Sequence, residues 1–274
     1  MRNKIIQLPF KLWLGIIVFS IIFIMSLVSI FWTPYNVEIL NISNKFISFG
    51  DKNFLLGTDH FGRDVLSMIM VGARNSLFIA FISLLIGLIF GVPVGLLSST
   101  FSNKFIDELF MRTNDVIFAF PALVTAIMIT ASFGPSAVNA IIAVGIFNIP
   151  VFARLVRASS LPILKQQFIL AAKVSGKSNL RISIEHVLPN ISNLIIIQST
   201  IQFSIGILAE SGLSYIGLGA QPPSISWGKM LAESQTMISF APNLAIIPGL
   251  SLFLTILSIN LIGDGLRDIN ENKK

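Results

Sequence analysis

Three places in the sequence carry residue types that could perform chemistry, and His60 is the first. It lies between Asp59 and Asp64, and a histidine flanked by carboxylates could hold a metal ion. The metal interpretation is weak, because the only other histidine, His186, is expected on the opposite side of a membrane. We expect instead a structured loop whose charges pair with one another, and we predict no metal site.

The second place is Gly176-Lys177-Ser178, which looks like the end of a phosphate-binding loop. Such a loop needs a glycine five residues before its last glycine, where this chain has Ala171, and it needs a preceding strand. We therefore reject a nucleotide site here, and no other stretch offers one. The chain also lacks cysteine, which excludes thiolate metal sites, disulfides and a cysteine nucleophile. We predict no catalytic residue, no cofactor and no enzyme activity for this chain alone.

Glu210 is the third place, at the outer end of a predicted membrane span. A charge at the bilayer centre costs about 2.5–3.5 kcal/mol on insertion scales. A proton relay would need partner acids at membrane depth, and Asp264 is expected at the far face. We interpret Glu210 as an interfacial or pore-mouth polar contact that can reach water.

Composition identifies the medium in which these residues lie. The 274 residues are 54% hydrophobic and 12% charged, about half of the charge in a typical soluble domain. The net charge is +6, but in a membrane protein the placement of the positive residues matters more than their sum. The composition therefore predicts an all-α membrane protein and does not favour nucleic acid as a partner.

Apolar segments predict about six transmembrane helices, since a bilayer core of about 30 Å needs about 20 helical residues. Residues 12–32 are too long an apolar run for a signal peptide and are interpreted as a retained span. Residues 116–153 are too long for one span, and Gly134-Pro135-Ser136 divides them into spans three and four. The other predicted spans are residues 75–103, 191–209 and 244–263.

The distribution of positive residues predicts the orientation. Of the 19 Lys and Arg residues, 14 lie on the side of the two termini and 5 on the other. The positive-inside rule therefore places both termini and the basic segment at residues 157–190 in the cytoplasm, where ATP is.

This basic segment is expected to fold on its own. Residues 159–175 predict one helix, closed by Gly176 with a positive φ, and residues 180–187 a second helix that ends before Pro189. From the pattern alone two interpretations stay open, namely a docking surface for a protein and an amphipathic helix on the bilayer surface. The residues expected on one face of the first helix are Leu164, Phe168, Ala171, Ala172 and Ser175.

The spacing in this segment resembles the EAA motif of bacterial ABC-importer permeases. That motif is matched by Ala171-Ala172, by Gly176 and by Leu188-Pro189, whereas Leu170 replaces the family's Glu and His186 replaces its usual Ile. The resemblance implies a coupling helix that sits in a groove of a separate ATPase subunit. We expect Leu170 to pack either against its own chain's second helix or into an ATPase groove without the matching charge. The residues that the resemblance assigns to coupling are Leu170, Ala171, Ala172, Gly176, His186, Leu188 and Pro189.

An external loop carries a second resemblance, to the second permease of dipeptide, oligopeptide and nickel importers. Its signature is followed by matching stretches at residues 72–77, 215–230 and 263–268, in the same order as in that family. Gly57 and Gly62 suit tight turns there. The signature residues are Gly57, Thr58, Asp59, Gly62, Arg63 and Asp64.

Taken together, the resemblance implies a type I ABC-importer transmembrane domain. We expect an N-terminal span and external loop over residues 1–72, a transport domain over 73–264 that includes the coupling segment, and a cytoplasmic tail over 265–274. The implied localisation is the bacterial plasma (inner) membrane, with multiple passes and both termini in the cytoplasm.

The implied function is that of a permease subunit, which couples ATP hydrolysis on another subunit to import of peptides, nickel or a related solute. The implied partners are a second, different permease, two ATPase subunits or domains that hold ATP and Mg, an extracytoplasmic solute-binding protein and membrane lipid. The alternative is an ion-coupled secondary transporter or channel, but such proteins often show paired repeats and charges at the membrane midplane. Neither feature is found in this sequence.

Overall fold

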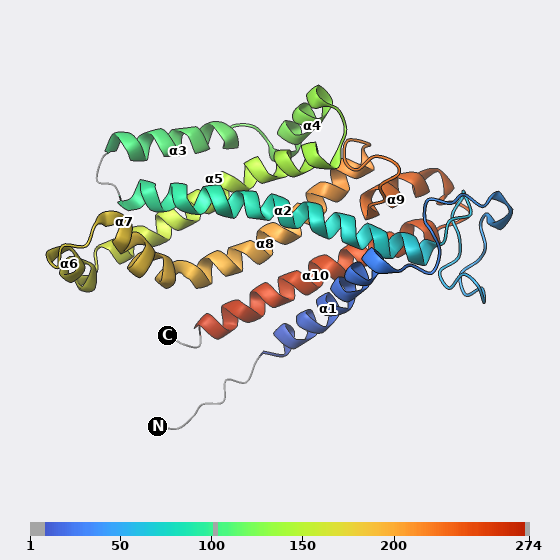
Figure 1. Cartoon of the computed structure of the whole chain (residues 1–274), viewed down its shortest axis with the longest axis horizontal. Helices are drawn as coiled ribbons and strands as arrows, with labels where there is room; N and C mark the ends of the chain where they lie inside the picture. The colour runs from blue at the N-terminus through green and yellow to red at the C-terminus, as the bar shows by residue number, and fades with distance from the viewer. Residues whose placement is uncertain (1–8, 101–103, 272–274) are drawn as a thin grey trace, which may run out of the picture.

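The computed structural model describes residues 9–100 and 104–271, and in these residues the fold is built from helices (Figure 1). Two short 3₁₀ turns lie at Ile42–Asn44 and Gln235–Met237, and a π turn at Ser183–Val187 precedes α8. The helices are α1 (Phe10–Phe31), α2 (Val65–Thr100), α3 (Lys104–Phe118), α4 (Ala122–Phe133), α5 (Ala137–Leu164), α6 (Gln167–Val174), α7 (Asn179–Ile182), α8 (Leu188–Tyr215), α9 (Trp227–Ser234) and α10 (Asn243–Glu271).

Five of the described helical segments are long and apolar enough to cross a membrane, and the number is six if one bent pair of helices counts as a single span. The five contain α1, α2, α5, α8 and α10. The sixth combines α3 with α4, which meet at an angle of 79°. The third span was predicted to end at the turn at Gly134, as it does, but the structure also interrupts it at residues 119–121. The helix breaks before Pro121, because proline has no N–H to donate and disfavours a helical conformation in the residue before it.

The central packing of the bundle is between α2 and α5, and three glycines of α2 permit it. A Cβ atom at Gly91 would lie 2.5 Å from the carbonyl oxygen of Ile149, and one at Gly95 would lie 2.5 Å from that of Ala153. Gly87, Gly91 and Gly95 recur at every fourth residue, the spacing by which small residues let membrane helices approach closely. This close pair forms the axis around which the other helices are arranged (Figure 1).

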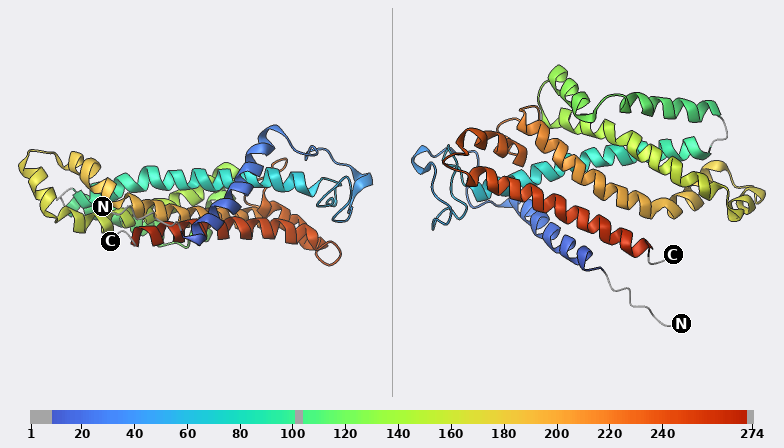
Figure 2. Two further views of the ribbon diagram at one scale, coloured as in Figure 1. Left: turned by 90° about the horizontal axis from the view of Figure 1, so that it is seen from below. Right: turned by 180° about the vertical axis from the view of Figure 1, so that it is seen from behind.

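The two ends of the bundle differ in shape (Figures 1 and 2). One end carries α6 and α7, which extend beyond the long helices, and α1 begins and α10 ends toward this side. The opposite end carries α9 and the long loop between α1 and α2. Each end has a buried apolar cluster of its own, around Trp227 near α9 and around Ile169 near α6.

Candidate functional site

The protruding end is a helical hairpin, called here the basic hairpin (residues 165–187). Its turn is made by Gly176, whose φ of +80° confirms the predicted left-handed stop. The side chain of Ser178 accepts a hydrogen bond from the backbone N–H of Arg181 at 3.4 Å and caps α7.

The predicted helix limits of this segment are wrong at two places. Residues 159–175 do not form one helix, because α5 continues to Leu164 and the chain turns at residues 165–166 before α6 begins. The second helix does not end before Pro189 either. It passes through the π turn directly into α8, where Pro189 lies in the first turn and a missing N–H is tolerated.

The hairpin is anchored to the membrane helices by a small apolar core. Ile169 and Ala172 of α6 and Ile182 of α7 are buried together with Leu96 of α2 and Val156 of α5. Ala172 therefore faces its own chain, while the adjacent Ala171 is exposed. The predicted common face is thus wrong, since Ile169 and Ala172, three residues apart, form the buried stripe of α6.

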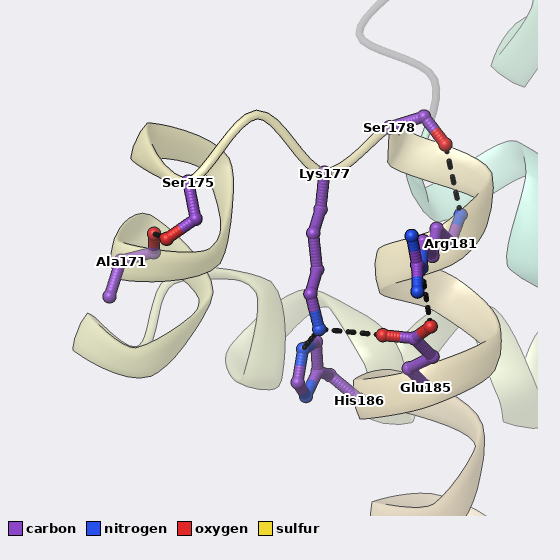
Figure 3. A network of polar contacts seen from close by, with 7 residues as sticks. All are labelled: Ala171, Ser175, Lys177, Ser178, Arg181, Glu185 and His186. Atoms are coloured by element: carbon purple, nitrogen blue, oxygen red, sulfur yellow. Dashed lines mark hydrogen bonds and ion pairs between the residues drawn. The ribbon is translucent and has the colours of Figure 1, made fainter.

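A polar network closes the open side of the hairpin (Figure 3). Lys177 Nζ lies 2.6 Å from Glu185 Oε2 and 3.1 Å from His186 Nε2. Arg181 Nε donates to the other oxygen, Glu185 Oε1, at 2.5 Å. The network joins the turn after α6 to the π turn before α8. It therefore holds the angle between α6 and the helical segment that begins with α7.

The sequence analysis singled out His186 but did not predict the network that it forms with Lys177, Glu185 and Arg181. The spacing of Arg181 and Glu185 by four residues was an available signal, because such pairs are neighbours on a helix. The contact of Lys177 with Glu185 and His186 was not predictable, since it depends on the turn at Gly176.

The outer surface of the hairpin is apolar to an unusual degree. Val174 is 89% exposed and Leu170 is 54% exposed, and Phe168, Leu180 and Ile184 are exposed as well. The expectation that Leu170 packs against its own chain's second helix is therefore wrong. Exposed apolar side chains rimmed by charge are typical of a surface that binds another protein or a membrane.

In the external loop at the opposite end, Asp59, Arg63 and Asp64 all find partners, and Asp59 pairs with Arg63 within the loop as predicted. Arg63 pairs with Asp59 at 2.7 Å and also with Glu233 of α9 at 2.8 Å. Asp64 accepts hydrogen bonds from the backbone N–H (2.8 Å) and the hydroxyl (2.6 Å) of Ser67 and so caps α2. Thr58 is buried and accepts the N–H of Ile47 at 2.9 Å. The loop charges thus serve its own structure.

The turns of this loop confirm the role expected for its two signature glycines. Gly57 and Gly62 both have φ of +77°, a conformation that costs glycine least. The ring of His60 lies against that of Phe61, with centroids 3.9 Å apart. Among the residues that the structure describes, no group of three His, Asp or Glu side chains could hold a metal ion.

Glu210 is not at a pore mouth, so the prediction of a water-accessible contact is wrong. α8 continues past it to Tyr215, and the side chain is completely buried. Its carboxylate accepts hydrogen bonds from Ser214 Oγ at 2.7 Å and from Ser211 Oγ at 3.3 Å. Ser214 Oγ in turn accepts the N–H of Ala220 at 3.2 Å. Glu210 therefore supports the loop that follows α8.

Two hydrogen bonds connect the end of this loop and the start of α9 to α2. Asn75 Nδ2 donates to the carbonyl of Ile225 at 2.6 Å, and Trp227 Nε1 donates to that of Ile69 at 3.1 Å. These bonds and the Glu210 cluster connect α2, α8 and α9 into one rigid outer end. The basic hairpin is tied to α2 by the buried contact of 2.7 Å between the hydroxyls of Ser183 and Thr100.

Comparisons with known proteins agree with this architecture. A family model described as "Binding-protein-dependent transport system inner membrane component" matches residues 87–274. The dipeptide transport system permease DppC of Alkalihalophilus pseudofirmus is 45% identical over 217 residues, which are 79% of this chain and 71% of that protein. The glutathione transport system permease GsiD of Pectobacterium atrosepticum is 37% identical over 257 residues, 92% of this chain and 85% of that protein.

Among solved structures, an inward-facing form of the MetNI methionine ABC transporter aligns with a TM-score of 0.62. The match covers 74% of this chain and 95% of that chain at 18% identity, so it bears on the fold alone. The long helices, the broken pass and the protruding hairpin thus form a type I ABC-importer transmembrane fold. The chain belongs to the family of binding-protein-dependent transport system inner membrane components, and it is a multi-pass permease subunit of an ATP-driven importer.

Proposed function

We propose that the chain forms one transmembrane half of an importer for short peptides, including glutathione-like ones. The proposal is supported by the two relatives described above, which are permeases for dipeptides and for glutathione. Both substrates are short peptides that carry a free amine and a free carboxylate. A separate solute-binding protein selects among such substrates, and a second, different permease completes the path.

In this proposal the basic hairpin docks on a separate ATPase subunit, which holds ATP and Mg. The observation that carries it is the exposed apolar surface at Leu170 and Val174, on a hairpin whose inner side is anchored in its own core. Because Ile169 and Ile182 pack against α5, movement of a bound ATPase would displace the hairpin as a unit. It would thereby pull on the membrane helices.

The proposed orientation puts the hairpin and both termini in the cytoplasm of a bacterial cell. The self-paired external loop then faces the binding protein. The alternative of an ion-coupled transporter is set aside, because the chain belongs to a family of binding-protein-dependent permeases.

A pair of matched variants tests the docking surface. Val174→Glu puts a charge on the hairpin tip, and Ile39→Glu puts one on the similarly exposed external loop. In cells that co-express the cognate ATPase subunits, Val174→Glu should abolish co-purification of the ATPase and Ile39→Glu should not. Equal recovery with both variants would contradict the proposed docking surface.

Cysteine labelling tests the orientation independently, and the native chain has no cysteine that would interfere. A membrane-impermeant reagent should label Lys177→Cys only from the cytoplasm and Lys52→Cys only from outside. The reverse pattern would end the proposal, because the hairpin would then face away from ATP.

A further inference from the structure

An apolar groove opens between α1, α2 and α8, with a volume of about 540 Å³. This volume lies within the range of ligand pockets. Its walls combine five phenylalanine rings with leucine and isoleucine side chains. Phe203 of α8 makes edge-to-face contacts with Phe19 at 6.2 Å and with Phe81 at 6.4 Å between centroids. Phe23 and Phe78 also line the groove and are more than 40% exposed. We call this cavity the aromatic groove.

Among the residues that the structure describes, Arg74 is the single charged one that lines the aromatic groove. No ion pair of Arg74 is found in the described part of the chain, and its one hydrogen bond is a long contact of 3.4 Å with the carbonyl of Ser29. A guanidinium carries five N–H donors and matches the oxygens of a phosphate in pairs. In a membrane such a group requires an anion or water, since a charge without a partner is costly there.

The depth of Arg74 is that of a membrane interface. Its contact residue Ser29 lies three positions before Trp32, an exposed tryptophan at the end of α1, where aromatic belts mark the boundary with water. From Arg74 to Leu84 the helix rises about 15 Å, half of a hydrocarbon core of about 30 Å. The aromatic groove therefore runs from the headgroup level to the middle of the bilayer.

We propose that the aromatic groove is a specific site for an anionic phospholipid, with the phosphate on Arg74 and one acyl chain along the phenylalanines. One positive charge above an apolar lining complements an amphiphile with a negative head. The membrane helix of a protein partner would satisfy Arg74 only if it placed an acidic residue at the same depth. The lipid fills the space between α1 and α8 and ties α1 to the bundle.

Photolabelling of the native protein tests the site. The full chain, with the subunits that co-purify with it, is placed in phosphatidylcholine vesicles that contain a trace of lipid with a diazirine on its acyl chain. The tracer is either phosphatidylglycerol or phosphatidylcholine, and labelled peptides are mapped by mass spectrometry. The peptide with Phe78 and Phe81 should be labelled about fivefold more by the phosphatidylglycerol probe, the ratio expected for one charge near the surface. Ile21, an exposed α1 residue outside the groove, should be labelled equally by both.

Two variants of Arg74 separate charge from packing. Arg74→Gln should reduce the fivefold preference to none, and Arg74→Lys should retain most of it. Equal labelling of the native protein by both probes would overturn the proposal. So would labelling at Ile21 with none at Phe78 and Phe81, because a protein partner would then cover the aromatic groove. The comparison of the two probes needs no variant, so it remains decisive if Arg74→Gln fails to fold.

Discussion

The outer end of the bundle and the basic hairpin use polar residues in opposite ways. At the outer end, Asp59, Asp64 and Glu210 are buried and accept hydrogen bonds from residues of the same chain. In the hairpin the ion pairs of Glu185 lie at the surface, and Val174 is almost fully exposed. A buried, satisfied polar group stabilises its own fold, whereas an exposed apolar group stabilises nothing until a partner covers it.

The glycines of the two ends show the same contrast. Gly62 and Gly176 both have positive φ, near +80°. A Cβ atom at Gly62 would lie 1.7 Å from the carbonyl oxygen of Asn41, whereas one at Gly176 would meet nothing within 4 Å. Packing and backbone conformation therefore both require a glycine at the outer turn, whereas at the hairpin turn only the backbone conformation requires one. Four substitutions, two at each end, test the contrast between the outer end and the basic hairpin.

The largest effect is expected from Gly62→Ala at the outer end. It adds the strain of a left-handed residue, about 1–2 kcal/mol, to overpacking of about 1–3 kcal/mol against the backbone of Asn41. Thermal unfolding in detergent, monitored by tryptophan fluorescence, should show a large loss of stability. Trp227 is buried, so its emission should change when the outer end unfolds. Gly50→Ala is the control, because Gly50 also has positive φ but open space around it. Equal losses for the two variants would mean that packing does not constrain the outer turn.

Glu210→Ala should have the next largest effect. It removes the acceptor of Ser214 and Ser211 in a buried place, which costs about 1–3 kcal/mol. Glu210→Gln keeps an acceptor oxygen and should cost less. The measurement is again thermal unfolding in detergent, and identical losses for Ala and Gln would show that the hydrogen bonds to the serines do not matter.

Gly176→Val tests the hairpin turn. The strain should exceed the roughly 0.4–1 kcal/mol associated with glycine substitutions at compatible sites, because a branched residue is forced to positive φ. Insertion into the membrane should be normal, while recovery of the ATPase in a pull-down should fall. Gly212→Val is a suitable control, since Gly212 also has open space but lies inside α8. Unchanged recovery of the ATPase with Gly176→Val would contradict a role for the turn in docking.

Leu170→Glu should have the smallest effect on the fold. The side chain is more than half exposed, so the stability should change by less than about 0.5 kcal/mol. We expect coupled ATP hydrolysis and uptake both to fall, because the leucine is an apolar contact adapted to its partner. A rise in both would mean that the native site is degraded relative to the family's Glu. No change in either would mean that position 170 does not touch the ATPase.

Local patterns predicted the features that depend on a few neighbouring residues. The positive φ of Gly176, the internal pairing of Asp59 with Arg63 and the break at Gly134 are all found as expected. A kink at Pro121 is expected of a proline within a span, but the full break of 79° does not follow from hydropathy, because apolar composition continues through it. The serines that bond to Glu210 are its neighbours on α8, but its burial was missed because it depends on how the helices and the loop after α8 pack around it.

The amino-acid sequence by itself determined the medium, the approximate number of passes, the asymmetry of positive charge and the family, because each depends on composition or on spacing along the chain. The tertiary structure alone decided which side chains meet. It paired Arg63 with Glu233, fastened Trp227 to α2, turned Ala172 inward and left Arg74 at the mouth of the aromatic groove. Such contacts join residues far apart in sequence, and their free energy arises only when the helices pack.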